Sequence, residues 1–566
     1  MVAGAAGQGV QSSGDVLAKA LARGGYDIFS DQDYESRIRG GDSFSRIRVR
    51  DVPVRAIAER LDMLLALDRD NLLSHKDMVS FDGVIIYDGE RVQGIEEDGR
   101  LLGMPLEKLA VEATGAKVAA NTVAVGAATA LMDYEFDVVA SVVAVQFANR
   151  GIGDQNVRAA RAGYDYVKAN YSGKFPHRLR PMRPGSKMLI SGNEALALGA
   201  LAAGCKFYAG YPMTPSTTIL EYMSTRADAM DVVVVQPEDE IAAANMAVGA
   251  AFAGVRAMTA TSGSGFALMV EALGLAGMTE TPVVMVDAQR PAPAVGLPTR
   301  TEQGDLQFVL SAAPGDFPRA VLAPVNIEDC FWLTVRAFNI AEKYQMPVIV
   351  LTDHFLASSY ATVEPFDLSQ VRIERGALLT DEELATIRFY KRHQITDTGI
   401  SPRALPMQSP NVLVVSDADE HDEEGHLTES AHDRAQQVAK RMRKLDLLAR
   451  EVAPPKLYGP PGAETALLAW GSTYETLKET VDILRAEGAD VNLLQFNELS
   501  PFPAGQTEAA LAKAKRVIVV ENNATGQFAR LLRAETGIRA TAKVLRFDGR
   551  PFTPAGVARE LKEVLR

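Results

Sequence analysis

The sequence predicts an α/β protein whose central part is a doubly wound parallel sheet. The clearest signal is residues 232–290, where short apolar runs alternate with alanine-rich helical patterns. A second block of βα alternation occupies residues 462–566. Runs that are apolar throughout are typical of strands buried on both faces, as in parallel sheets covered by helices. No run of about 18 apolar residues occurs, so the sequence predicts no membrane span.

The central stretch contains three expected strands and two expected helices in alternation. β-branched runs of four or five residues favour strands, and alanine-rich segments favour helices. We expect strands at residues 232–235, 257–261 and 283–286, and helices at 241–251 and 266–275. The strands lead into Glu238-Asp239-Glu240, the loop Ser262-Gly263-Ser264-Gly265, and Arg290. Ligands gather at the carboxyl ends of parallel strands, so these segments predict a binding site.

Composition excludes several classes of function. The net charge of −13 argues against a general nucleic-acid binder, because phosphate binding needs a basic surface. Two cysteines, Cys205 and Cys330, are too few for a disulfide framework or for a cysteine-ligated iron–sulfur cluster. We therefore expect a reducing, cytoplasmic location, and any iron–sulfur cluster should belong to another chain. The first residues carry no secretory signal pattern.

Residues 1–170 form the first expected domain. A turn that contains Gly7 and Gly9 leads into a helical pattern at 15–22, and such a turn is a ready anion site. Its G-x-x-G-x-G spacing is not the dinucleotide fingerprint, and the strand that should precede it is almost absent from the pattern. Arg37 and Arg39, beside paired glycines, would clamp a phosphate or form a solvated basic turn.

A linker and three further segments follow the first domain. Residues 171–187 are rich in proline and basic residues, which is typical of an exposed linker. We expect a second domain at 188–364, a connector or insertion without its own sheet at 365–461, and a third domain at 462–566. The connector contains a basic helical pattern at 434–450 and a polar run at 417–426. That run suggests either metal ligands or a solvated loop; the loop is favoured because no His-Glu-x-x-His spacing occurs.

Each candidate site residue has a plain structural alternative. Glu240 could be one of several acids that stabilise a helix N-terminus through the helix dipole. It could instead be a buried acid that shares a proton with a cofactor ring. Arg290 would form either a surface salt bridge or a bidentate grip on a substrate carboxylate. Thr214 and Thr299 stand out only because they lie in proline-flanked loops beside these strand ends.

Taken together, the motifs resemble those of the 2-oxoacid:ferredoxin oxidoreductases, in the fused form in which a γ domain precedes the α domains. They cover nearly the whole chain in the family's order. The motifs are Gly7-Gln8-Gly9-Val10, Ser36-Arg37-Ile38-Arg39-Gly40-Gly41, Tyr211-Pro212-Met213-Thr214-Pro215-Ser216, Glu238-Asp239-Glu240, Ala260-Thr261-Ser262-Gly263, the segment from Gly296 to Asp305, Glu420-His421-Asp422 with Gly425-His426, and Glu521-Asn522-Asn523.

The resemblance implies three domains: an N-terminal γ-type α/β domain, a thiamine diphosphate pyrimidine-binding doubly wound sheet, and a C-terminal domain similar to that of transketolase. It implies that thiamine diphosphate is bound between this α chain and a separate β chain. The β chain would carry Mg²⁺ and a [4Fe–4S] cluster, in an (αβ)₂ assembly that serves ferredoxin.

The resemblance also implies roles for single residues. Glu240 would hydrogen-bond the aminopyrimidine ring as the catalytic acid, and Thr214, Arg290 and Thr299 would hold the 2-oxoacid. Further cofactor contacts are expected at Ser262, Gly263 and Phe266. Coenzyme A is expected at the first domain, near Gly7 and Gly9; that Arg37 and Arg39 bind its phosphates is our own inference and is not implied by the resemblance. No metal ligands are expected in this chain.

The expected activity is the CoA-dependent oxidative decarboxylation of 2-oxoglutarate to succinyl-CoA and CO₂, with electrons passing to ferredoxin. One departure leaves the substrate open. The family commonly shows Gly-Gly-Pro-Ser-Thr after the arginine, whereas this chain has Pro291-Ala292-Pro293-Ala294-Val295. Pyruvate or a branched-chain 2-oxoacid is therefore an alternative substrate. Two other classes of protein are also alternatives: a cluster-free thiamine enzyme, and a non-catalytic regulatory subunit that binds CoA or a nucleotide.

Overall fold

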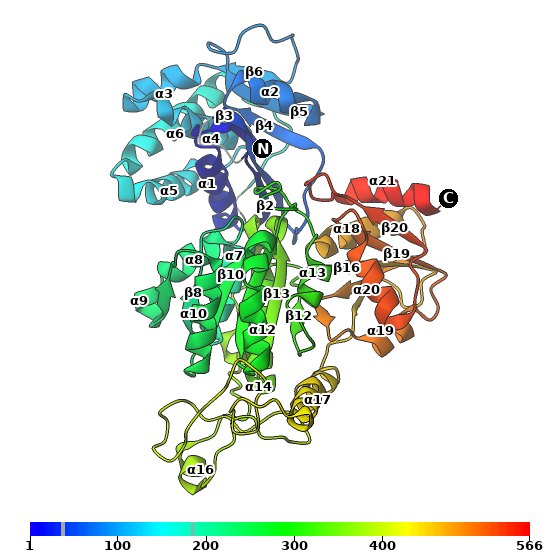
Figure 1. Ribbon diagram of the computed structural model, residues 1–566. Helices are drawn as coiled ribbons and strands as arrows, with labels where there is room; N and C mark the ends of the chain where they lie inside the picture. Colours follow the sequence, from blue (N-terminus) through cyan, green and yellow to red (C-terminus); the bar gives the residue numbers. More distant parts are fainter. Residues whose placement is uncertain (36–39, 181, 183–184, 186, 566) are drawn as a thin grey trace. The chain divides into compact units, whose positions relative to one another are not determined.

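A computed structural model describes residues 1–35, 40–180, 182, 185 and 187–565 (Figure 1). The chain divides into two compact units. The first comprises Met1–Ile190, Ser359–Pro365 and Thr553–Gly556, and the second comprises Ser191–Ser358, Phe366–Phe552 and Val557–Arg566. None of the described helices is both long and apolar enough to cross a membrane.

The first unit contains an eight-stranded mixed sheet with the order β6-β5-β4-β1-β3-β2-β14-β7. Strands β1, β4, β5 and β6 are parallel, whereas β3 is antiparallel to both β1 and β2. The strands are β1 (Val2–Ala6), β2 (Asp27–Asp33), β3 (Gly40–Arg50), β4 (Leu61–Ala66), β5 (Val79–Asp88), β6 (Leu101–Met104), β7 (Met188–Ser191) and β14 (Tyr360–Val363). The sequence-based expectation that a strand before the Gly7 turn is almost absent is wrong. Strand β1 is made of small residues that hide its pattern, but it pairs on both sides.

Helices cover both faces of this sheet. Helix α2 packs on β1 and β4, while α1, α4 and α5 pack together with strand side chains in the main core. The helices are α1 (Val10–Arg23), α2 (Arg69–His75), α3 (Leu106–Thr114), α4 (Ala120–Leu131), α5 (Phe136–Gln146) and α6 (Gly153–Asn170). Phe175 of the expected exposed linker is buried in this core, so the linker prediction is wrong at that residue.

The second unit contains the predicted parallel sheet, with the order β18-β12-β13-β11-β10-β8-β9. All neighbours are parallel except β18, which is antiparallel to β12. The strands are β8 (Cys205–Ala209), β9 (Val233–Val235), β10 (Arg256–Thr261), β11 (Val283–Gln289), β12 (Ala320–Leu322), β13 (Pro347–Asp353) and β18 (Glu498–Ser500). Strand β9 lies at the edge and Val233 is 57% exposed, so the expectation of burial on both faces fails there.

The helices of this sheet form two layers, with α10 and α12 in one and α7 and α14 in the other (Figure 1). The single helix expected at 266–275 is two helices, which break at Met269. The helices are α7 (Gly192–Ala202), α8 (Thr217–Ser224), α9 (Ala227–Met230), α10 (Glu240–Phe252), α11 (Gly263–Leu268), α12 (Val270–Met278), α13 (Leu306–Ser311), α14 (Ile327–Tyr344) and α15 (His354–Ser358).

The connector at residues 366–455 has two α-helices, α16 (Asp381–Thr386) and α17 (Ala431–Leu448). Only two isolated bridges, and no strand, occur in this described segment, but β15 (Lys456–Tyr458) lies inside the connector expected at 365–461, so the expectation of a connector outside any sheet fails at its end. Helix α17 confirms the basic helical pattern expected at 434–450.

The last part of the chain adds a five-stranded sheet with the order β15-β17-β16-β19-β20. Its elements are β15 (Lys456–Tyr458), β16 (Thr465–Trp470), β17 (Val491–Phe496), β19 (Arg516–Glu521), β20 (Ala542–Leu545), α18 (Thr473–Ala486), α19 (Ala504–Leu511), α20 (Gln527–Thr536) and α21 (Pro554–Leu565). The βα alternation predicted for residues 462–566 is present. Residues of this sheet and of the seven-stranded sheet share one apolar core, which contains Phe266, Trp470 and Phe528.

Candidate active site at the carboxyl ends of the central strands

Glu240 is the first residue of α10 and is 3% exposed. The helix begins there because the side chain of Asp239 caps it, accepting a hydrogen bond from the Ala242 N–H at 2.8 Å. The Oε1 atom of Glu240 is buried and has no hydrogen-bond partner among the described residues. A Cβ atom placed on Gly265 would lie 2.6 Å from this oxygen. The carboxylate therefore points into the Gly/Ser loop and away from solvent.

Arg290 follows β11 and is 6% exposed. Its Nη1 donates to the carbonyl oxygen of Thr214 at 2.8 Å, and its Nε has no partner in the described structure. Burial lowers the pKa of Arg290, while the negative charges of Asp305 and Glu240 oppose that shift. The alternative of a surface salt bridge is wrong, because the guanidinium is buried beside the two predicted site residues Thr214 and Glu240.

The Thr214 loop is fixed from both sides of Pro215. Asn193 donates to the carbonyl of Pro215 at 2.7 Å, and the hydroxyl of Ser216 donates to the carbonyl of Met213 at 2.7 Å. These bonds hold the Thr214 carbonyl where Arg290 can reach it. The stiff turn predicted from the two prolines is thus an ordered support for the arginine.

Thr299 is 8% exposed, and Arg300 donates to its carbonyl at 3.0 Å and to its hydroxyl at 3.3 Å. Within the described residues it makes no hydrogen bond to Thr214 or Arg290. The structure therefore brings Glu240, Arg290 and Thr214 together more directly than it does Thr299.

The residues expected at the cofactor differ in what they offer. The buried Oγ of Ser262 has no partner among the described residues. Gly263 opens α11, and a Cβ there would lie 2.4 Å from Oδ2 of Asp305. Phe266 is fully buried and its ring packs edge-on against Phe308. The Phe266 ring thus belongs to the core, and its contact with a cofactor stays a prediction.

Sequence reasoning assigned no role to three further carboxyl groups beside these residues. Asp287 lies within β11 and is fully buried, and burial raises its pKa well above the ordinary value. Asp305 is 7% exposed, and burial raises its pKa to about 6. Burial also raises the pKa of Glu302 to about 7. An acid directly after a buried strand is the sequence signal that points to Asp287.

The loop from Gly296 to Asp305 is attached to the five-stranded sheet. The backbone N–H of Gln303 donates to the carbonyl of Asn522 at 2.6 Å, and the side chain of Gln303 accepts from the Asn522 N–H at 3.0 Å. Asn523 donates to the carbonyl of Gln303 at 3.0 Å. The Glu521-Asn522-Asn523 motif thus supports the loop that carries Thr299.

The Gly7 and Gly9 turn lies in the first unit, between β1 and α1. Both glycines have positive φ, 92° and 79°, which favours glycine at these positions. They line a cavity of about 630 Å³ together with Ser12, Asn121 and Arg150. Arg37 and Arg39 lie outside the described residues.

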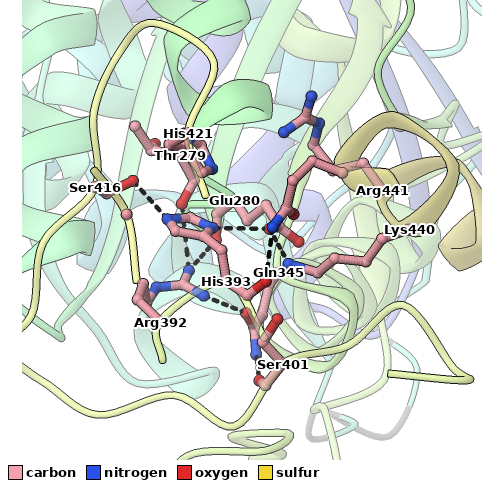
Figure 2. A network of polar contacts seen from close by, with 12 residues as sticks. Thr279, Glu280, Gln345, Arg392, His393, Ser401, Ser416, His421, Lys440 and Arg441 are labelled. Atoms are coloured by element: carbon pink, nitrogen blue, oxygen red, sulfur yellow. Dashed lines mark hydrogen bonds and ion pairs between the residues drawn. The ribbon is translucent and has the colours of Figure 1, made fainter. Parts of the chain in front are cut away.

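A second polar cluster lies under the connector, centred on the fully buried Glu280 (Figure 2). Lys440 donates to its Oε1 at 2.6 Å, and Lys444 donates to its Oε2. His393 contacts Oε1 through Nδ1 at 2.9 Å, and its other nitrogen contacts Ser416 at 2.8 Å. The interpretation of residues 417–426 as a solvated loop is wrong for His421, which is fully buried with its ring 3.9 Å from that of His393. His426 is exposed as expected.

The Glu280 cluster has a donor set that could bind a cation, since Glu280, His393 and His421 offer atoms within 4.8 Å of one another. Two buried ammonium groups already bind both oxygens of Glu280, however. A divalent cation would have to enter against these charges. We therefore interpret the cluster as an ion-pair network that attaches α17 to the segment after α12.

Three family models match successive parts of the chain. The model described as "Pyruvate ferredoxin/flavodoxin oxidoreductase" matches residues 1–166. The one described as "Pyruvate flavodoxin/ferredoxin oxidoreductase, thiamine diP-bdg" matches residues 198–444, and "Pyruvate:ferredoxin oxidoreductase core domain II" matches 463–557.

Known proteins match over the full length. The α subunit of a 2-oxoacid:ferredoxin oxidoreductase from a Sulfolobus species is 32% identical, over 100% of this chain and 96% of that protein. The α subunit of 2-oxoacid:ferredoxin oxidoreductase 2 from Aeropyrum pernix is 33% identical, over 100% and 97%. The 2-oxoglutarate synthase subunit KorA of Methanothermobacter marburgensis is 32% identical, over 64% of this chain and 96% of that protein.

A solved structure shares the whole fold. It is the 2-oxoglutarate:ferredoxin oxidoreductase from Magnetococcus marinus with 2-oxoglutarate, coenzyme A and succinyl-CoA bound. The TM-score is 0.92 at 32% identity, over 100% of this chain and 99% of that chain. The three-domain α/β architecture predicted from the sequence is confirmed. The chain belongs to the 2-oxoacid:ferredoxin oxidoreductase family, as a thiamine diphosphate-binding α subunit.

Proposed function

We propose that this chain is the α subunit of a 2-oxoglutarate:ferredoxin oxidoreductase. The enzyme converts 2-oxoglutarate and coenzyme A to succinyl-CoA, CO₂ and a proton, and it passes two electrons to ferredoxin; the reverse carboxylation uses the same site. The observation that carries the proposal is the carboxylate of Glu240, which is sheltered from water with an unpartnered oxygen beside Gly265.

The residues around Glu240 fit the aminopyrimidine of thiamine diphosphate. That ring needs a buried carboxylate to share a proton with a ring nitrogen, and polar groups that are still free to bond. Glu240 Oε1 and Ser262 Oγ are both buried without a partner among the described residues, and Gly263 and Gly265 keep the loop clear of side chains. When bound, the cofactor supplies the carbon nucleophile and the electron sink for decarboxylation. Glu240 holds and returns the proton at its Oε1.

Arg290 and Thr214 suit the carboxylate of a 2-oxoacid, and Thr299 completes the proposed substrate set. The arginine is fixed by the Thr214 carbonyl, and its Nε remains available for a charge-assisted hydrogen bond. The choice of 2-oxoglutarate is supported by the Magnetococcus marinus structure, which has that substrate bound, and by the KorA relatives, which are named 2-oxoglutarate synthases. The Pro291-Ala292-Pro293-Ala294-Val295 segment keeps pyruvate and branched-chain 2-oxoacids as the alternative.

A β subunit would carry the Mg²⁺ and the [4Fe–4S] cluster in an (αβ)₂ assembly. The two cysteines support this assignment because both are buried, and burial raises the thiol pKa of Cys205 to about 12 and that of Cys330 well above its ordinary value. Thiols that resist ionisation are poor cluster ligands, because the thiolate is the form that binds iron. Coenzyme A would bind in the first unit at the cavity of Gly7 and Gly9, with Arg37 and Arg39 at its phosphates. The functional segments would be residues 1–170, 188–364, 365–461 and 462–566.

The first test is the substitution Glu240→Gln in the chain co-purified with its partner subunit. Turnover with 2-oxoglutarate, CoA and a low-potential dye should fall by at least about 100-fold, because the amide cannot take up the proton. Subunit assembly should be unchanged by size-exclusion chromatography. The matched control is Glu238→Gln, since Glu238 belongs to the same acidic motif but is exposed. Equal activity in the two variants would reject the proposed role of Glu240.

The substrate itself is tested by a panel of 2-oxoglutarate, pyruvate and a branched-chain 2-oxoacid with the purified complex. The proposal expects the highest kcat/KM with 2-oxoglutarate. A preference for another member of the panel would change the substrate and leave the reaction class intact. Absence of turnover with every member, in a complex that contains iron and thiamine diphosphate, would reject the function.

A further inference from the structure

The site holds more buried carboxyl groups than it has hydrogen-bond donors for them. Asp287 is fully buried, and both of its carboxyl oxygens lack a partner among the described residues. The Oδ2 of Asp305 is buried without a partner as well. A carboxylate that is buried without a donor is costly, so such a group favours its protonated form.

Both aspartates are held in place by their neighbours. Asp287 lies in β11, in register with Thr261 on one side and Leu351 on the other. The backbone N–H of Asp305 donates to Oε1 of Gln289 at 2.9 Å, and the Asp305 carboxyl lies against the Cα of Gly263. Neither group can turn toward solvent without a change in the loop or the sheet.

The charged groups around Asp287 and Asp305 come from several elements. The positive charge that acts on Asp305 is that of Arg290, which also interacts electrostatically with Glu240. Glu302 adds another carboxyl group beside Asp305, and Asp305 in turn acts on Asp287. Burial, together with the charges of Arg300 and Arg290, lowers the pKa of His354 in α15 to about 4, so that His354 is neutral between pH 6 and pH 8.

A 2-oxoacid that binds Arg290 brings at least one more negative charge to this site. If Asp305 is ionised, it competes with the substrate for the same guanidinium and repels the incoming carboxylate. If Asp305 carries a proton, the whole charge of Arg290 is available to the substrate. Binding of the anion and protonation of the pair therefore favour each other.

We propose that Asp287 and Asp305 form a proton-accepting pair that couples binding of the 2-oxoacid carboxylate at Arg290 to the uptake of one proton. This inference rests on the proposed function, and it specifies how the same site responds to pH. Asp287 and Asp305 are positioning residues in this scheme, because they act on the substrate through Arg290.

The direction of the pH effect follows from the raised pKa values. Burial raises the pKa of Asp305 to about 6 and raises the pKa of Asp287 well above its ordinary value, so Asp305 loses its proton near pH 6 in the free protein. A bound anion raises that pKa. Substrate should therefore bind tightly below about pH 6 and more weakly as the pH rises above it.

The test measures binding without turnover, on the complex of this chain with its partner subunit. The probe is the 2-hydroxy acid that corresponds to the best substrate of the panel, for example 2-hydroxyglutarate, since it keeps the carboxylates but has no carbonyl to react. Its Kd should rise at least about fivefold between pH 6 and pH 8. Calorimetry at pH 7 in two buffers of different ionisation enthalpy should show uptake of roughly half to one proton.

Asp305→Asn should remove most of this linkage, because the amide is neutral at every pH. The Kd of that variant should stay near the low-pH value of the wild type, with little proton uptake. The matched control is Asp329→Asn, which changes a half-buried carboxyl group of raised pKa that lies in α14 and accepts a hydrogen bond from Asn497. Its pH dependence should equal that of the wild type.

The inference would be overturned by the absence of proton uptake in the wild type, by a Kd of the wild type that does not change with pH, or by wild-type linkage in Asp305→Asn. The wild-type calorimetry decides the matter even if the variant does not fold. A substrate other than 2-oxoglutarate changes the probe and leaves this test in force. Failure of every 2-hydroxy acid to bind would reject the inference, whereas failure of turnover alone rejects only the proposed function.

Discussion

At the scale of single residues, Glu240 is a polar group kept in place at a cost to stability. A buried group without a hydrogen bond costs about 1–3 kcal/mol. The fold accepts this at Glu240 Oε1 and at Ser262 Oγ, which lie in the same loop region. Unsatisfied groups that cluster at strand ends mark a binding site more reliably than the acidic motif does alone.

Arg290→Ala should lower kcat/KM for the 2-oxoacid roughly 30-fold to 5,000-fold, because a substrate carboxylate loses its buried partner. This corresponds to a loss of about 2–5 kcal/mol of transition-state stabilisation. Steady-state kinetics of the purified complex measures the change. A suitable control is Arg226→Ala, since this guanidinium stacks on Tyr222 and not on a site residue. An unaltered kcat/KM for Arg290→Ala would remove the arginine from the substrate site.

Gly265→Ala should displace the Glu240 carboxylate. The added Cβ would lie 2.0 Å from the hydroxyl of Thr261 and 2.6 Å from Glu240 Oε1, so one of these groups must move. We expect turnover to fall on the order of 100-fold while the fold is retained. Gly249→Ala in α10 is the control, because its Cβ would meet no atom within 4 Å and alanine favours the helix. Comparable kinetics for the two variants would contradict the proposed packing.

The sequence singled out Glu240 and Arg290 because each follows an apolar strand, and parallel strands bring their ends together. Asp287 has the same signal, because it directly follows the expected strand, but Asp305 does not. The importance of Asp305 lies in a carboxyl oxygen without a partner, which depends on how Gln289 and Gly263 position it across the loop. Pairing of that kind has no signature in local sequence.

At the scale of elements, the strands and helices of the two βα blocks were predictable because their periodicity is strong. Strand β1 was missed because alanine and glycine give little hydrophobic contrast. The break at Met269 was missed because both halves have the same helical pattern. The basic pattern predicts helix α17, but it does not predict that Lys440, Arg441 and Lys444 of this helix are buried.

Glu280→Gln should destabilise the connector by about 3–5 kcal/mol, because Lys440 and Lys444 then lose a buried counter-charge. Thermal and chemical denaturation of the chain measures the loss, and protease cleavage in residues 366–455 should become faster. The control is Glu424→Gln, in the same polar run but exposed. Equal stability of the two variants would mean that the Glu280 network contributes little.

At the scale of the whole molecule, the sheet of the first unit is not made of continuous sequence. Strand β14, at residues 360–363, pairs antiparallel with β2, and the Thr362 hydroxyl bonds Asp27 at 3.1 Å. The sequence predicts that these residues end the second domain, because a short strand carries no information about the sheet that it joins.

A fragment of residues 1–170 should therefore self-associate, because the edge of β2 is left without its partner. Size-exclusion chromatography with light scattering should show oligomers or aggregates. A fragment that also carries residues 187–191 and 359–365 through a flexible glycine–serine tether should be monomeric. A monomeric and fully stable 1–170 fragment would show that β14 is dispensable.

The bonds between Gln303 and the Asn522-Asn523 turn have a practical consequence for engineering. A chimera that takes only the segment corresponding to Pro291–Asp305 from a relative, in order to change the 2-oxoacid preference, would replace one side of this hydrogen-bonded contact and leave the other unchanged. The relative's residues that correspond to 521–523 should therefore be exchanged together with that segment.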